Sequence, residues 1–70
     1  MSKYLIPVCE EGYPYIVSTS ARSIEEAERR IMNQLTNHWN LDTPADWDEF
    51  CTMAYEANYD VGEIRDIEEF

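Results

Sequence analysis

Ser23-Ile-Glu-Glu-Ala-Glu-Arg-Arg-Ile-Met-Asn-Gln-Leu-Thr-Asn-His-Trp39 is the stretch that decides the fold of this 70-residue chain. It opens with a capping box, because Ser23 followed three residues later by Glu26 lets each side chain bond the other residue's backbone amide. Apolar side chains then recur every three or four residues, which is typical of one face of a helix. The stretch therefore predicts an amphipathic helix against which the rest of the chain packs. Its apolar face consists of Ile24, Ala27, Ile31 and Leu35, flanked by Met32 and Trp39.

Two short stretches before the helix are rich in β-branched and aromatic residues, at positions 3–10 and 13–19. They predict a β-hairpin in which Gly12 supplies the unusual backbone angles of the turn. Pro7 has no N–H to donate to a strand ladder, so we expect the first strand at a sheet edge. Alternation assigns one face of the first strand to Tyr4, Ile6 and Val8, and one face of the second to Tyr13, Tyr15 and Val17.

A second helix is indicated after residue 42. Thr43 is the expected N-cap, Pro44 takes the first helical position, and Asp46 lies in the first turn. The loop at residues 40–42 is short, so we expect the two helices to pack as an antiparallel or crossed pair. The apolar stripe of this helix is Trp47, Phe50, Cys51, Ala54 and Asn58, widened by Met53 and Ala57.

Residues 62–70 fit two interpretations. Asp60 and Glu63 could cap a third helix, but the acids near the chain end would then crowd the negative end of the helix dipole. A third strand is favoured, because a two-stranded hairpin alone is only marginally stable. The chain is thus expected to be a single domain over residues 1–70. Its fold class is α+β, a small two-layer ββααβ domain whose antiparallel three-stranded sheet, the hairpin plus a C-terminal strand, packs against two helices.

Composition and net charge restrict the classes of function that this chain can have. A hydrophobic content of 44% and an aromatic content of 13% indicate a folded domain despite a net charge of −10. Residues 31–70 hold ten acids against one arginine, so this half should repel nucleic acid and favour basic partners. No apolar run reaches the ~20 residues that span a bilayer, and the two cysteines show no metal or redox spacing. We expect a cytoplasmic protein that binds neither membranes nor nucleic acid directly.

The side chains that could take part in catalysis or metal binding fit structural roles better than functional ones. His38 and Cys51 could act as base and nucleophile, but both lie on or beside apolar helix stripes. The acids around residue 46 lack the spacing of a calcium loop, and two glycines cannot form a phosphate loop. We therefore expect no metal, no cofactor and no enzymatic activity. The acids concerned are Asp42, Asp46, Asp48 and Glu49.

The sequence favours a non-catalytic protein-binding or regulatory module, acting as a homodimer or docked on a larger protein. The alternative is a nucleic-acid mimic that blocks a DNA- or RNA-binding protein. In size, charge and mixed pattern the chain is similar to small acidic inhibitors of phages and mobile elements, such as anti-restriction and anti-CRISPR proteins, without a motif specific to one family. The expected binding residues are Trp39, Asp46, Asp48, Glu49, Tyr55, Glu56, Tyr59, Asp60, Glu63 and Asp66, and the mimic would add Glu68 and Glu69.

Overall fold

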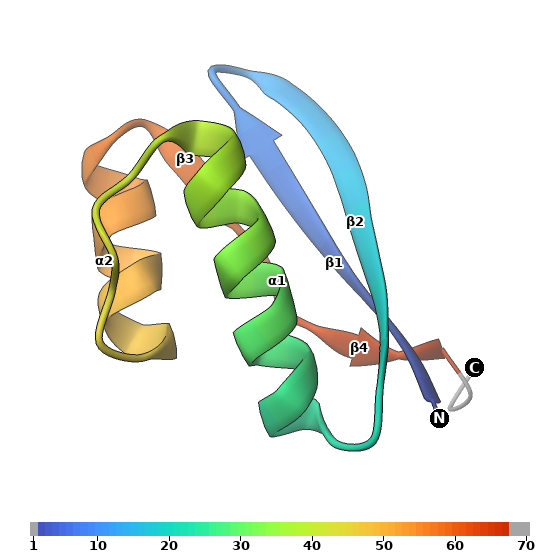
Figure 1. The fold of residues 1–70 in the computed structure, drawn as a ribbon. Helices are drawn as coiled ribbons and strands as arrows, with labels where there is room; N and C mark the ends of the chain where they lie inside the picture. Colours follow the sequence, from blue (N-terminus) through green and yellow to red (C-terminus); the bar gives the residue numbers. More distant parts are fainter. Residues whose placement is uncertain (1, 68–70) are drawn as a thin grey trace.

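A long antiparallel hairpin forms the frame of the domain in the computed structural model, which describes residues 2–67 (Figure 1). Strand β1 (Ser2–Glu10) pairs with β2 (Tyr13–Ala21) along its whole length. Glu11 and Gly12 form the turn with φ values of 51° and 87°, as in a type I′ turn. The predicted hairpin is confirmed, and Glu11 shares the left-handed conformation that the sequence assigned to Gly12 alone.

Two short strands complete the sheet on the other side of β1. Strand β3 (Tyr59–Val61) pairs with residues 8–10 of β1, and β4 (Arg65–Asp66) pairs with residues 4 and 5. The expected C-terminal strand is therefore present, although it begins before residue 62 and is interrupted at residues 62–64. Residues 68–70 lie outside the described part of the chain. The sheet order β2-β1-β3 puts β1 in the centre, so the prediction of an edge position for it is wrong.

Pro7 is tolerated in this central strand because of what lies opposite it. Around a two-residue turn, alternate residues of β1 turn their backbone groups toward β2 and away from it, and Pro7 turns away. Its missing N–H therefore faces the interruption between β3 and β4. There the Gly62 N–H donates to the Pro7 carbonyl at 2.8 Å. A Cβ on residue 62 would lie 2.7 Å from Pro7 Cγ, so only glycine allows this approach.

Helix α1 (Ile24–Trp39) begins as predicted. The Ser23 hydroxyl accepts the Glu26 N–H at 3.2 Å, and the helix ends at Asn40 in the left-handed conformation. Arg30 bonds the Glu26 carboxylate one turn away at 3.0 Å.

Helix α2 (Trp47–Glu56) begins one turn later than the sequence indicated. Its N-cap is Asp46, whose carboxylate accepts the Glu49 N–H at 2.8 Å, so the prediction of Thr43 as cap is wrong. Asp46 with Glu49 repeats the capping-box spacing, and aspartate is the stronger cap. Pro44 is buried in the preceding loop instead.

The two helices run in the same general direction, because the segment between them returns along their length (Figure 1). Both helices end near the hairpin turn: the Trp39 indole bonds Glu10, and the strand that follows α2 pairs Tyr59 with Glu10. The prediction of an antiparallel or crossed pair assumed a loop of three residues. The actual connection at residues 40–46 is long enough to span a ten-residue helix, about 15 Å.

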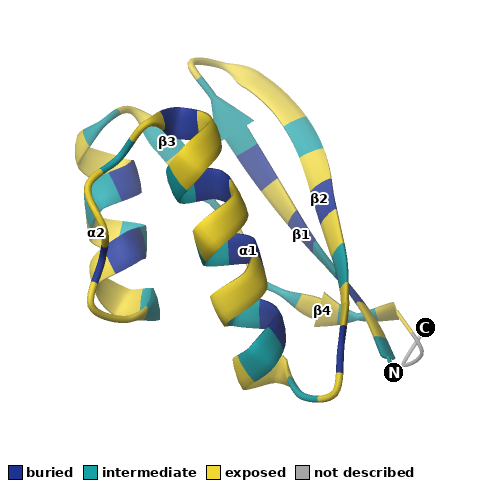
Figure 2. Cartoon of the chain, viewed as in Figure 1, coloured by how far each residue is buried: buried dark blue, intermediate teal, exposed yellow. Residues whose placement is uncertain are grey.

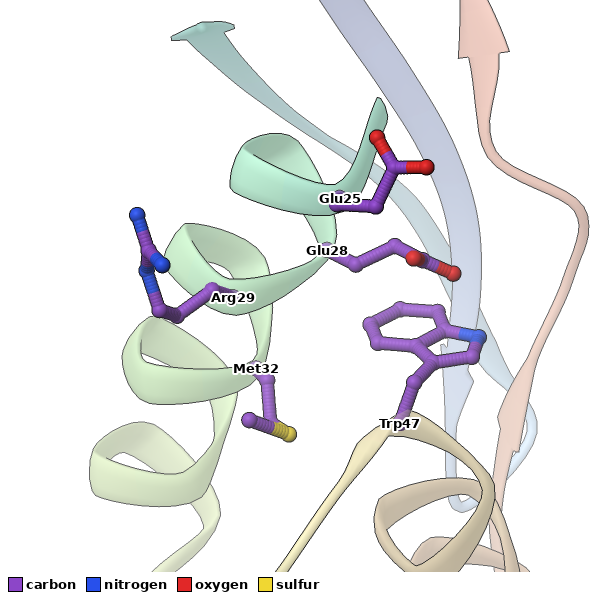
Figure 3. A pocket seen from close by; sticks show the side chains of 5 residues that line it. All are labelled: Glu25, Glu28, Arg29, Met32 and Trp47. Carbon is purple, nitrogen blue, oxygen red and sulfur yellow. The ribbon is translucent and has the colours of Figure 1, made fainter. Parts of the chain in front are cut away.

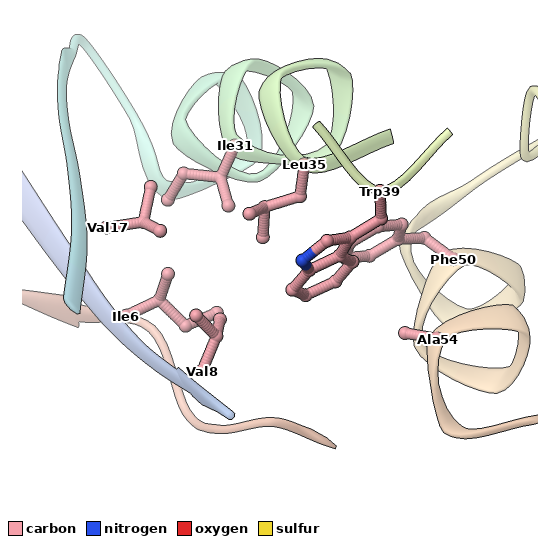
Figure 4. Packing of buried hydrophobic residues seen from close by; sticks show 8 residues of the cluster. All are labelled: Ile6, Val8, Val17, Ile31, Leu35, Trp39, Phe50 and Ala54. Carbon is pink, nitrogen blue, oxygen red and sulfur yellow. The ribbon is translucent and has the colours of Figure 1, made fainter. Parts of the chain in front are cut away.

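The core lies between the sheet and the helices, and both helices of residues 2–67 lie on the same face of the sheet (Figures 1 and 2). Trp39 is the largest member of the core, and its ring is stacked on that of Tyr59, with ring centroids 4.4 Å apart, and on that of Phe50, at 6.2 Å. Figure 4 shows Trp39 beside Phe50. The predicted stripes supply most of the buried side chains and the inward face of β1 is confirmed, but Ile24, predicted on the apolar face of α1, is 42% exposed. The main cluster consists of Ile6, Val8, Val17, Ile31, Leu35, Trp39, Phe50 and Ala54.

Candidate protein-binding surfaces

A polar cluster fastens the end of α1 to the hairpin. One oxygen of Glu10 accepts the Trp39 indole N–H at 2.8 Å and the Tyr15 hydroxyl at 3.3 Å, and it lies 3.5 Å from His38 Nε2. Burial raises the pKa of the Tyr15 phenol, and the nearby Glu10 carboxylate adds to the rise, so the hydroxyl stays protonated. Sequence reasoning missed this cluster, because Glu10 and Trp39 are 29 residues apart and nothing local links them.

Cys51 and His38, the pair considered for catalysis, have different surroundings. His38 is exposed beside Tyr15 and Glu10 at the end of α1. Cys51 is half-buried on α2, and burial, followed by the charges of Asp48 and Glu28, raises the pKa of its thiol. A raised pKa keeps the thiol protonated and lowers its nucleophilicity at neutral pH.

The N-terminal ends of the two helices meet around a shallow hollow of about 220 Å³ (Figure 3). Glu28 extends over the Trp47 ring, while the Arg29 guanidinium points away from both carboxylates. Burial raises the pKa of the Glu28 carboxyl, and the charges of Glu25 and then Asp48 raise it further. The positive N-terminal ends of the two helix dipoles lie side by side here, and the negative charge of these acids interacts favourably with both. Within residues 2–67, no three His, Cys, Asp or Glu side chains are arranged to hold a metal ion.

A second hollow, of about 420 Å³, opens at the C-terminal end of α2. We call it the α2 corner, and Tyr55, Glu56, Asn58 and Asp60 line it. Tyr55 is 75% exposed, one of the largest exposures of any big hydrophobic side chain in the described chain. Asn58 adopts a left-handed conformation, with φ of 69°, and turns the chain from α2 into β3. The expectation that Asn58 belongs to the helix stripe is therefore wrong.

The expected binding residues do not form one surface. Trp39 is only 6% exposed and belongs to the core, and Tyr59 is partly buried with its ring stacked on Trp39. The remaining eight fall into three groups that follow the ends of α2 and the last strands. They are Asp46, Asp48 and Glu49 at the start of α2; Tyr55, Glu56 and Asp60 at the α2 corner; and Glu63 and Asp66 at or beside β4.

Comparisons with known proteins give no relative for this arrangement. No family model matches the chain, and neither the curated proteins nor the solved structures contain a match. Among residues 2–67, neither helix has the length and apolar character that crossing a bilayer requires.

Proposed function

We propose that this protein is a non-catalytic protein-binding module that recognises a basic segment of its partner at the α2 corner. The observation that carries the proposal is the position of Tyr55, an exposed aromatic ring beside the carboxylates of Glu56 and Asp60 around one open hollow. Tyrosine is enriched among interface residues that dominate binding energy, and a rim of like charge selects for partners of the opposite sign.

The α2 corner is preorganised in the unbound protein. Tyr55 is held on the last turn of α2, and Asn58 fixes the direction in which Asp60 leaves the helix. Because tyrosine has few rotatable bonds, ordering it on binding costs little conformational entropy. The partner's lysine or arginine side chains would meet two carboxylates that no described ion pair neutralises.

The experiment is a pull-down from a lysate of the native host that compares matched variants. Tyr55→Ala, and Glu56→Lys combined with Asp60→Lys, should each abolish recovery of the partner. Glu49→Lys, compared with Glu56→Lys alone, is the control, because it makes the same charge change on the same helix at the end away from the corner. Retention of the partner by both corner variants, or its equal loss with Glu49→Lys, would contradict the proposed surface.

The second candidate function is the nucleic-acid mimic. It is favoured by the crowding of Glu25, Glu28 and Asp48, whose mutual repulsion destabilises the fold. The same crowding produces a strong negative field, as the phosphates of a nucleic acid do, and this would attract a nucleic-acid-binding protein. A mimic would recover a nucleic-acid-binding protein that rising salt releases, and Glu49→Lys would weaken it as much as the corner variants do. A salt-resistant partner that depends on Tyr55 would exclude the mimic.

A further inference from the structure

The outer edge of β2 is unpartnered in the described chain. β2 is nine residues long, about 30 Å at ~3.3 Å per residue, and it pairs only with β1. The register with β1 leaves the N–H and C=O groups of Ile16, Ser18 and Ser20 directed outward. Pro14 also faces outward but has no N–H to offer. Such an edge is a ready template for another strand.

The two edges of this sheet differ in how they resist association. On the β1 side, β3 and β4 are three and two residues long and carry Asp60, Arg65 and Asp66, the short charged strands that discourage pairing. Along β2, residues 12–21 contain no charged side chain, although the whole chain has a net charge of −10. Ile16 on this strand is 62% exposed and Tyr13 at its start is 77% exposed.

We infer that β2 pairs with β2 of a second copy of this chain, giving a dimer with one continuous sheet. Two identical strands pair antiparallel about a two-fold axis. Because β2 carries no charged side chain, two acidic copies that meet along this edge keep their carboxylates apart. Antiparallel pairing also brings the Glu11 end of each strand beside the Arg22 end of the other, which have opposite charges. This dimer uses a different surface from the α2 corner and does not depend on the proposed function.

The backbone pattern selects one register. Pairing Ser18 with Ser18 of the copy also pairs each Ile16 with a Ser20, so all three outward residues use both their N–H and C=O groups. Shifting the axis by one residue toward Pro14 would bring Pro14, which lacks an N–H, opposite Ser20. A hollow of about 400 Å³ between β2 and α1 lies beside this edge, lined in part by Gln34, Leu35 and His38. It leaves room for helix-side side chains of the added strand.

Sedimentation of the intact chain tests the dimer. At about 100 µM the protein should sediment as a dimer, and the dimer fraction should increase with salt, which screens repulsion between two acidic copies. Ser18→Pro removes an outward N–H without removing a bond to β1, so it should weaken association by at least about tenfold while the melting profile stays cooperative. A monomeric wild-type protein, or an unchanged dimer in Ser18→Pro, would overturn the inference.

Disulfide trapping tests the register even if the proline variant fails to fold. In a background with Cys9→Ala and Cys51→Ala, Ser18→Cys should form a covalent dimer on oxidation. Hydrogen-bonded antiparallel pairs have Cα atoms ~5.5 Å apart, within the disulfide range. Ser20→Cys is the matched control, because residue 20 is also exposed and outward-facing. In this register, however, Ser20 lies opposite Ile16 of the second copy, so the two Ser20 residues are about four residues, roughly 14 Å, apart along the strands. Equal crosslinking by both variants would overturn the Ser18 register.

Discussion

Replacing Gly62 by alanine should destabilise the domain by about 1–3 kcal/mol, and two opposing effects decide the sign. Gly62 is not in the left-handed region, so alanine fits its backbone and would stabilise by about 0.4–1 kcal/mol through the unfolded chain. Against this, the added Cβ would lie 2.7 Å from Pro7 Cγ and 3.0 Å from the Pro7 carbonyl oxygen. The proline ring cannot rotate away, so the strand must shift.

The shift has two costs. Overpacking of this kind costs about 1–3 kcal/mol, and lengthening the 2.8 Å bond from the Gly62 N–H to Pro7 loses about 1 kcal/mol more. These costs exceed the entropic gain. A 70-residue domain has a total stability of about 4–10 kcal/mol, so the loss is a large fraction of it. The melting temperature should fall by about 5–20 °C.

Urea denaturation followed by tryptophan fluorescence measures the change, and a double-mutant cycle isolates its cause. Pro7→Ala removes the ring atoms that clash, so Gly62→Ala should cost at least about 1 kcal/mol less in the Pro7→Ala background. Gly12→Ala is the control: it is strained by its φ of 87° with no atom within 4 Å of the added Cβ, so Pro7→Ala should not rescue it. A neutral or stabilising Gly62→Ala, or an additive cycle, would refute the steric reasoning.

Three further predictions concern the turn, the second cap and the helix acids. Glu11→Asn should raise the free energy of unfolding by about 0.5–1 kcal/mol in urea, because asparagine tolerates the left-handed turn position better. Asp46→Ala should cost about 1 kcal/mol by freeing the Glu49 N–H, whereas Thr43→Ala should change the urea midpoint little. Because the pKa of Glu28 is raised in the folded state, its ionisation opposes folding as the pH rises above its ordinary value of 4.5; Glu28→Gln should therefore stabilise the protein at pH 7, and thermal melts should show the difference shrinking toward pH 4.

Local patterns were enough to predict the first helix and the hairpin. Ser23 and Glu26 mark the start of α1 within one turn, and Gly12 marks the turn of the hairpin, so neither depends on distant residues. The second helix was placed correctly apart from its first turn and its end, because the sequence predicted Thr43 as the cap and Asn58 as part of the stripe. The stronger cap and the capping-box spacing of Asp46 and Glu49 already favoured the later start, whereas the burial of Pro44 in the loop depends on tertiary packing.

The strand order and the binding residues were harder to predict. The position of β1 depends on the fit between Pro7 and Gly62, 55 residues apart in sequence. The same non-local packing buries Trp39, which the aromatic content alone had placed among the expected binding residues. Tyr55 was an expected binding residue on the same ground of aromatic content, and of Trp39, Tyr55 and Tyr59 it is the one that the structure leaves exposed. The sequence did not predict that Tyr55 lies beside Asp60, because this depends on the turn between α2 and β3.

The two prolines of the hairpin explain why one side of the sheet is completed and the other is open. Pro7 and Pro14 both lie at positions whose backbone groups turn away from the partner strand, so neither weakens the hairpin. Pro7 faces the third strand and divides it at Gly62 into β3 and β4, which are too short to extend the sheet further. Pro14 blocks only the first outward position of β2 and leaves an unbroken edge from Ile16 to Ser20. Of the two outer edges in the described chain, β2 therefore offers the longer uninterrupted row of outward backbone groups, which is why the proposed association uses this edge.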